Sequence, residues 1–300
     1  MTLLMPTRRG SLLIITLWVI VILSALAVAI ARQLSRELRV TKYRLARQQA
    51  MVLARGGVYL AVRILQQDET PADWLGDGWA SPQTFAPLPG WQVAISIMDE
   101  ERKLNVNRAS LEQLSRLTGQ ETIAQAIIDE VDGLEPTEDA PTAQPPYYAK
   151  NAPLIALEEL HHVPGMEADV EEMLRGFATP HGGGTPNINT VVSKVLVALG
   201  ISPEGVERVS HYREGVDGPE AHGADHVFEQ EQLLNTLQEL ELEDTDLNIL
   251  SGLVTSSQTF TVVSEAVATQ PILRARVTAV IQRSSGGEEA PPRIIAWREG

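Results

Sequence analysis

The side chains that could do chemistry are mostly acids, and they cluster near the middle of the chain. The densest cluster lies within residues 129–139 and contains Asp129, Glu130, Asp132, Glu135, Glu138 and Asp139. Oxygen ligands in a flexible loop suit Ca²⁺, which takes about six to eight of them. The candidate calcium ligands are therefore Asp129, Asp132, Glu135, Glu138 and Asp139. A merely solvated acidic loop is the alternative.

Other reactive groups form no recognisable catalytic pattern. His222 and His226 flank an Asp, and His161 and His162 are adjacent, but neither pair has the spacing of a His-Glu-x-x-His site. We expect surface histidines. The chain has no cysteine, which excludes thiol catalysis, Cys-ligated zinc and disulfides. It also lacks Gly-x-Ser-x-Gly and the phosphate-binding Gly-x-x-x-x-Gly-Lys loop. The sequence does not indicate an enzyme, and an anchored hydrolase has no motif to support it.

The N-terminal region predicts a membrane span. Ser11 to Ala31 is 21 residues without a charge, about 31 Å as a helix, which matches a bilayer core. Small residues near its end continue the apolar pattern instead of forming a cleavage site. The span is flanked by cations on both sides: Arg8 and Arg9 precede it, and six Lys or Arg residues follow within 32–47. Charge counting therefore does not set its orientation.

Charge divides the chain into two parts. Residues 1–65 hold ten Lys/Arg and one acid, Glu37, which leaves 14 basic and 38 acidic residues for 66–300, a net charge of −24. A charge of that sign repels phosphate backbones. General nucleic-acid binding by the C-terminal part is therefore disfavoured.

The apolar spacing after the span stays roughly helical, and no proline occurs in 11–70. One helix from Ser11 to Gln67, about 86 Å long, is therefore predicted, with Gly56-Gly57 as its soft point. The alternative is a membrane anchor followed by an ordinary amphipathic helix.

Strand patterns appear on both sides of a long helical stretch. Residues 68–90 are rich in Pro, Gly and Asp and are predicted to be a loop. Period-two alternation occurs at 91–98 and returns only at 260–262, 273–281 and 294–297. About 150 residues of helical pattern are thus inserted between the first and second strands.

The helical insertion repeats itself. Asn105-Val106-Asn107 aligns with Asn187-Ile188-Asn189 at an offset of 82, and each half closes on a similar segment, at 173–179 and 249–255. Two related bundles are predicted. Ser110 with Gln113 fits a capping box, so the first helix should begin there.

Two short elements resemble helix-hairpin-helix motifs, one ending at Gly119 and one at Gly165. In such motifs backbone amides at a helix start grip a phosphate. We favour a purely structural tight turn, because Arg116 and Lys150 are the only cations in residues 111–172.

The order of these features resembles a known family. A basic leader ending in Gly10, followed by an apolar helix that runs into a further domain, is typical of type IV pilins and pseudopilins. These usually carry Glu at the fifth position after the cut, and this chain has Ile15. The lack of this Glu is typical of the type II secretion system minor pseudopilin K family (general secretion pathway protein K), which this chain resembles. Further segments carry the resemblance: 47–65, 91–110, 145–166, 185–190 and 259–268.

The resemblance implies an α+β fold: a long N-terminal pilin-like helix packed on a small antiparallel sheet, with a large all-α insertion of two related helix-hairpin-helix or SAM-like bundles between the first and second strands. The expected parts are a leader (1–10), the transmembrane (11–31) and periplasmic (32–67) parts of the helix, a base with the first strand (68–104), helical subdomains 1 (105–184) and 2 (185–256), and the C-terminal strands (257–300).

The resemblance also implies a function. A prepilin peptidase would cut between Gly10 and Ser11, and the subunit would form the tip of a periplasmic pseudopilus that supports export of folded proteins across the outer membrane. Expected partners are minor pseudopilins I and J, pseudopilin H, the major pseudopilin and the inner membrane, which the chain crosses once in a Gram-negative cell, with its bulk in the periplasm. The family implies a calcium-binding acidic loop near 129–139, although this chain has only scattered acids there. The competing interpretation is a membrane-anchored helix-hairpin-helix nucleic-acid-binding protein.

Overall fold

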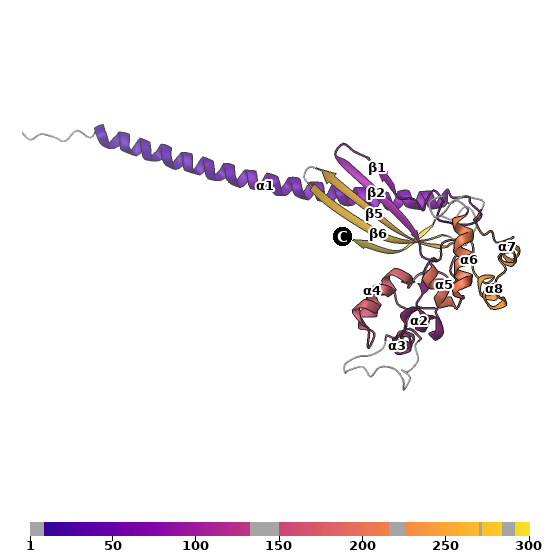
Figure 1. Ribbon diagram of the computed structural model, residues 1–300. Helices are drawn as coiled ribbons and strands as arrows, with labels where there is room; N and C mark the ends of the chain where they lie inside the picture. Colours follow the sequence, from indigo (N-terminus) through magenta and orange to yellow (C-terminus); the bar gives the residue numbers. More distant parts are fainter. Residues whose placement is uncertain (1–8, 133–149, 216–225, 270–271, 284–291) are drawn as a thin grey trace, which may run out of the picture.

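The structure is a computed structural model that describes residues 9–132, 150–215, 226–269, 272–283 and 292–300. Figure 1 shows a long helix that projects far beyond a sheet, with shorter helices gathered beside the opposite end of that sheet. We call the sheet with its helix the base, and the helical region within residues 100–258 the head. Each has its own hydrophobic core.

Helix α1 runs unbroken from Arg9 to Gln66, which confirms the single long helix predicted from the sequence. Its C-terminal third packs on the sheet through a stripe of mostly small side chains at helical spacing. These residues are at most 2% exposed: Ala50, Ala54, Val58, Ala61 and Leu65. Small residues let the helix backbone approach the strands closely. The predicted soft point at Gly56-Gly57 produces no break.

The base sheet is antiparallel and has the order β1-β2-β5-β6-β7. Its strands are β1 Gln83–Phe85, β2 Trp91–Asp99, β5 Thr259–Thr269, β6 Ile272–Gln282 and β7 Arg293–Glu299. The alternating residues of β2 and β5 bury one face against α1, as the period of two predicts. The stretch 68–90 is not wholly a loop, because β1 lies within it and pairs with β2.

The head is inserted between β2 and β5, as predicted. Its elements are β3 Leu104–Asn105, α2 Leu111–Thr118, α3 Glu121–Val131, the 3-10 helix η1 Leu157–His162, α4 Ala168–Phe177, β4 Ala178–Thr179, α5 Ser193–Leu199, α6 Pro203–Glu214, α7 Leu233–Glu239 and α8 Asp244–Leu250. Helix α2 begins with the predicted capping box of Ser110 and Gln113. The motif ending at Gly165 begins with η1, a 3-10 helix, rather than an α-helix.

The internal repeat is visible as a duplicated hydrogen-bond pattern. In the first half, the Asn107 side chain donates to the Leu154 carbonyl and accepts from the Leu154 amide. In the second half, Asn189 makes the same pair of bonds to Phe228. The preceding asparagines, Asn105 and Asn187, each accept from the backbone amide two residues ahead, at 2.9 Å. The two halves thus share the same pattern of asparagine side-chain to backbone hydrogen bonds.

Candidate assembly surfaces and the head–base junction

The N-terminal part of α1 exposes a large apolar surface. An 18-residue window within Leu12–Gln66 has a mean hydropathy of 3.0 and none of it is buried, so by length and composition this helix could cross a membrane. Its side chains are open on every side, for example Leu13 at 71% and Trp18 at 62%. A helix that is apolar all round needs lipid or other apolar helices around it.

The predicted processing residues lie at the start of this surface. Gly10 and Ser11 belong to the first turn of α1. Ile15 lies one turn further on, and its side chain is 58% exposed. The predicted cut and Ile15 thus lie about one turn apart near the N-terminal end of α1, in the part of the helix that does not pack on the sheet, which we call the stem.

A buried polar network joins head and base where β2 ends and β5 begins. Asp99 accepts hydrogen bonds from the Glu101 amide at 2.8 Å, from Ser257 Oγ at 2.7 Å and from Thr190 Oγ1. Glu101 accepts from the amides of Thr259 at 3.0 Å and Gly183 at 3.4 Å. Residues of both strands are thereby tied to the start of the second helical half.

The same network reaches the loop that follows α1. Asn187 donates to the Asp73 carbonyl at 3.0 Å and to Ser257 Oγ at 2.8 Å. The Asp73 carboxylate accepts from the Ser257 amide at 2.7 Å and from Arg283 Nη1 at 2.6 Å. Arg283 Nη2 also contacts Asp68 at 2.8 Å, and its guanidinium lies 4.7 Å from the centre of the Phe260 ring.

Burial changes the acidity of these groups. Desolvation raises the pKa of Asp73, which the neighbouring Arg283 opposes, and raises the pKa of Asp99. Desolvation, together with the charge of Asp99, raises the pKa of Glu101 to about 7. Burial therefore favours the protonated form of both carboxyl groups relative to exposed acids. Their oxygens are occupied by hydroxyl and amide donors, so the pair serves structure rather than acid–base chemistry.

Three carboxylates beside this network come within metal-binding distance of one another. Oxygens of Asp68, Asp73 and Asp77 all lie within 4.8 Å, and desolvation raises the pKa of Asp77 to about 6. Arg283 already pairs with two of the three, and Asp77 accepts from the Trp74 amide and the Trp79 indole. The cluster is therefore satisfied by the protein itself.

The predicted calcium ligands are only partly placed by the structure. Asp129 lies in the last turns of α3 and accepts a hydrogen bond from Gln125 at 2.7 Å, and Asp132 is the C-cap of that helix. Glu135, Glu138 and Asp139 lie outside the described residues. Asp129 is helical, which corrects its placement in a flexible loop. In the described part of the chain, neither acid belongs to a group of three potential ligands, and the calcium site stays a prediction.

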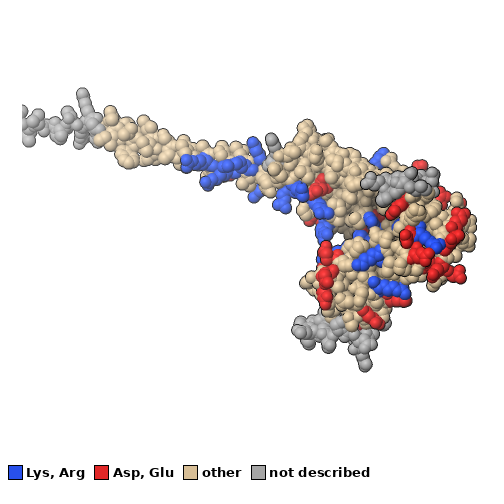
Figure 2. Space-filling model, in the orientation of Figure 1, with Lys and Arg blue, Asp and Glu red and all other residues tan. Residues whose placement is uncertain are grey.

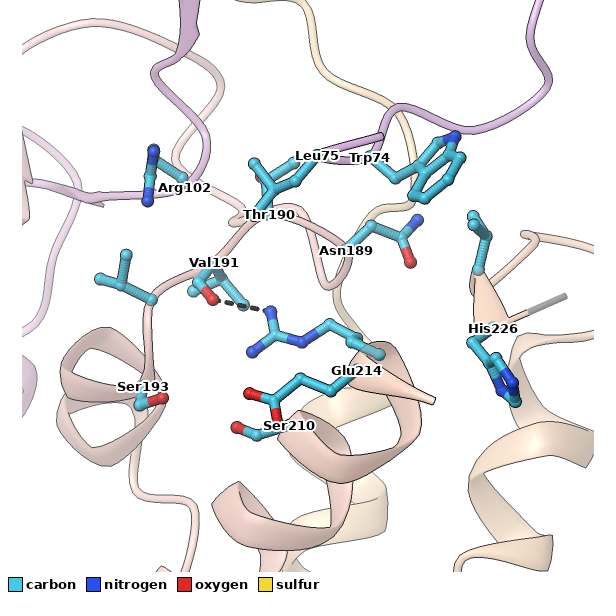
Figure 3. A pocket seen from close by; sticks show the side chains of 13 residues that line it. Trp74, Leu75, Arg102, Asn189, Thr190, Val191, Ser193, Ser210, Glu214 and His226 are labelled. Carbon is cyan, nitrogen blue, oxygen red and sulfur yellow. Dashed lines mark hydrogen bonds between the residues drawn. The ribbon is translucent and has the colours of Figure 1, made fainter. Parts of the chain in front are cut away.

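A cavity of about 260 Å³ lies between the loop after α1 and helices α5 and α6. Figure 3 shows Ser193 and Ser210 on one side of it and His226 on the other. No serine–histidine hydrogen bond is formed there among the described residues. Arg213 in its lining donates to the Val191 carbonyl at 2.8 Å, and desolvation lowers the pKa of Arg213 to about 10.

The junction acids are the residues that sequence reasoning missed. Asp73 and Ser257 form a hydrogen bond although they are 184 positions apart in the sequence. The one local signal was the run of charged residues directly after the strand at 91–98. An acid at the end of a buried strand is unusual enough to indicate a buried partner.

No family model matches the sequence, and no curated protein matches it. Among solved structures, a chain of the GspK-GspI-GspJ complex from the enterotoxigenic Escherichia coli type 2 secretion system is similar. The TM-score is 0.68 at 20% sequence identity, and the alignment covers 87% of this chain and 99% of that chain. The long helix, the antiparallel sheet and the further helices described above fit this fold. The protein therefore has a GspK-like fold.

Proposed function

We propose that this protein is a minor pseudopilin of a type II secretion system, held in the inner membrane by α1 and assembled at the tip of a periplasmic pseudopilus. The observation that carries the proposal is the division of α1 into two parts. The C-terminal third packs on the sheet, whereas the rest is exposed, and the N-terminal end of that exposed part is apolar. We expect the stem to lie in lipid before assembly and to pack against the stems of other subunits afterwards.

The GspK-like fold supports the same assignment. The similar solved chain belongs to a complex named for three pseudopilins, GspK, GspI and GspJ. We infer that this protein pairs with pseudopilins I and J of its own cell, and through them with pseudopilin H and the major pseudopilin. Binding would use the stem and the base, with the head left free.

Processing is the first test. A prepilin peptidase at the cytoplasmic membrane face should cut between Gly10 and Ser11, because glycine has no side chain to obstruct the scissile bond. Mass spectrometry of the chain from its native membranes should find Ser11 as the first residue. Gly10→Leu should leave the full-length chain in the membrane. Any other start in the wild type would argue against the assignment.

Complex formation is the second test. The full chain, coexpressed with pseudopilins I and J of the same organism, should co-purify with both from detergent extracts. An unrelated single-span protein carrying the same affinity tag is the control. Recovery of the chain alone would count against the proposed partners, even if the leader is processed.

The nucleic-acid alternative makes an opposite prediction. A helix-hairpin-helix receptor should retard duplex DNA on a gel at low salt, where phosphate contacts are strongest. We expect no retardation, since Arg116 beside the Gly119 turn is paired with Glu112 at 2.5 Å.

Ca²⁺ binding near the end of α3 stays a prediction. Titration calorimetry of the full chain with CaCl₂ should show heat of binding, and Ca²⁺ should raise the melting temperature. Asp132→Asn should reduce both effects. An absence of heat and of stabilisation in the wild type would remove the calcium site.

A further inference from the structure

The segment of α1 just after the apolar span carries cations that nothing in the described structure neutralises. Residues 32–47 contain six: Arg32, Arg36, Arg39, Lys42, Arg44 and Arg47. None forms an ion pair with a described residue. The one acid here, Glu37, accepts a hydrogen bond from Gln33 instead. Figure 2 shows this basic segment between the bare apolar stem and the base, well away from the acidic surface of the head.

Three of these arginines share one face of the helix. Arg32, Arg36 and Arg39 are spaced i, i+4 and i+7, which places them within about 60° of one another around the axis. We call them the arginine face. Lys42 and Arg44 point about 80° or more away from its centre by the same count. Arg39 Nε donates a hydrogen bond to the Ser35 carbonyl, at 3.2 Å.

The arginine face borders a shallow hollow of about 340 Å³. Its lining combines the three arginines with short side chains: Val28, Ala31 and Ser35. The hollow thus crosses the boundary between apolar and charged helix surface. A ligand that matches it needs an anionic group beside an apolar part, which is the chemistry of the glycerophosphate region of a phospholipid.

The arginine face lies on the side of α1 that packs on the sheet further along the helix. Arg32, Arg36 and Arg39 lie in line with Ala50, Ala54 and Ala61, the residues that pack on the sheet. Residues 32–45 are exposed and the first partly covered position of α1 is Ala46, so the stripe that is apolar and covered in the base becomes cationic and open near the predicted membrane span. In the orientation proposed above, these cations lie on the side of the membrane where positive residues are disfavoured, so they call for a specific anionic contact.

We propose that Arg32, Arg36 and Arg39 bind the phosphate headgroups of anionic phospholipids at the outer surface of the inner membrane and hold the stem at a fixed depth before assembly. This rests on the proposed function for the placement of α1 in the membrane. The span ends at Ala31, so the first arginine meets the headgroup layer directly and the third lies about 10 Å further out. Guanidinium groups bind phosphate oxygens through paired N–H donors.

The test measures lipid selectivity of the full chain in vesicles. The protein is reconstituted in phosphatidylcholine with a trace of spin-labelled phosphatidylglycerol or spin-labelled phosphatidylcholine, and electron spin resonance measures the fraction of each label immobilised by the protein. We expect the wild type to prefer phosphatidylglycerol at least fivefold, since one well-placed cation near an anionic surface contributes about that factor. High salt should weaken the preference.

Two double variants distinguish binding at the arginine face from non-specific attraction by the other cations of the segment. Arg36→Gln with Arg39→Gln, which leaves Arg32 in place, should lower the preference to less than half of the wild-type value. Lys42→Gln with Arg44→Gln removes the same charge from other sides of the helix and should keep most of the preference. Equal losses in the two variants would overturn the proposal, because diffuse attraction would then suffice.

Absence of phosphatidylglycerol preference in the wild type would also overturn it. If Arg36→Gln with Arg39→Gln then weakened capture of another pseudopilin, the face would belong to an acidic protein partner instead. Leader processing, measured by mass spectrometry, is independent of this result. A processed chain without lipid selectivity refutes only the lipid site, and a selective but unprocessed chain refutes only the proposed function.

Discussion

At the scale of single residues, the junction shows how burial converts ordinary acids into a pH-sensitive contact. Asp99 is the last residue of β2 and Glu101 follows two positions later; they are 1% and 6% exposed. Burial favours the protonated form of a carboxyl group, so the folded protein holds a proton that the unfolded chain releases. Stability therefore falls as pH rises from the ordinary pKa of glutamate toward the raised pKa of Glu101, about 7, and then levels off.

Glu101→Gln should remove most of this pH dependence. The amide keeps the size of the side chain and cannot ionise, so we expect the stability lost between pH 5 and 7.5 to be smaller than in the wild type by on the order of 2 kcal/mol, while Asp77 and the other buried acids keep their own contribution. At pH 8 the variant should be as stable as the wild type or more stable. Thermal unfolding followed by circular dichroism measures both curves. Parallel curves would show that Glu101 ionises normally in the folded state.

Asn189 makes a second prediction at this scale. Its side chain pairs with both backbone groups of Phe228, which is wholly buried. Asn189→Ala should cost about 2–4 kcal/mol, since it leaves a buried donor and a buried acceptor without partners. Asn248→Ala, at an exposed position in α8, is the matched control and should cost well under 1 kcal/mol. Similar losses in the two variants, measured by urea unfolding, would contradict the role of Asn189.

How far residues can be predicted from sequence depends on whether their partners are near in the chain. The capping box of Ser110 and Gln113 spans three positions, and it was predicted correctly. The asparagines of the repeat were found because the pattern occurs twice. Arg283 and Asp73 gave no such signal, because an ion pair across 210 positions exists only after folding.

At the scale of elements, the close contact between α1 and the sheet depends on a glycine. A Cβ at Gly57 would overlap the Ser264 side chain and crowd Val93, whereas Gly56 faces open space. Gly57→Leu should therefore push the helix from the sheet and cost about 1–3 kcal/mol. Gly56→Leu should be neutral or stabilising by up to about 1 kcal/mol, because leucine is the better helix former. Chemical unfolding in detergent compares the two, and equal stability would show that α1 is not in tight contact there.

Elements were predictable in proportion to their length and periodicity. Helix α1 and strand β2 match the expected bounds within two residues at each end. Strand β1 was missed because three residues carry no readable alternation, and it forms only because β2 offers an unpaired edge. The 3-10 geometry of η1 was equally invisible, because a proline-glycine turn fits either kind of short helix.

At the scale of the whole molecule, shape and charge separate three roles. The stem is apolar and then basic, the base presents a sheet to α1, and the head carries most of the visible acidic surface in Figure 2. The head is linked to the base through the buried junction, so it is held at the end of the sheet rather than tethered loosely. Repeating such a head along a tightly packed helical shaft would be sterically costly, whereas one copy at an end would fit.

The last prediction concerns Ile15 and the position of this subunit in the proposed filament. Pilin-like subunits are expected to pair a Glu at the fifth mature position with the N-terminal amine of the subunit above, an ion pair that matters because apolar helices surround it. With Ile15 the chain offers no charge to a subunit above. Its own Ser11 amine remains available to the Glu of a subunit below, so the chain can begin a filament without continuing one.

Ile15→Glu should therefore not improve secretion and should reduce it, since an unpaired carboxylate among apolar helices costs several kcal/mol. Ile15→Leu keeps an apolar side chain of the same size and should secrete like the wild type. Secretion of a reporter, with electron microscopy of pseudopili carrying a tag on the head, measures both effects. A glutamate variant that secretes better and occupies the shaft would show that the missing charge alone kept this subunit at the end. Wild-type heads along the shaft would refute the tip position itself, because neither the head nor Ile15 would then exclude the chain from internal sites.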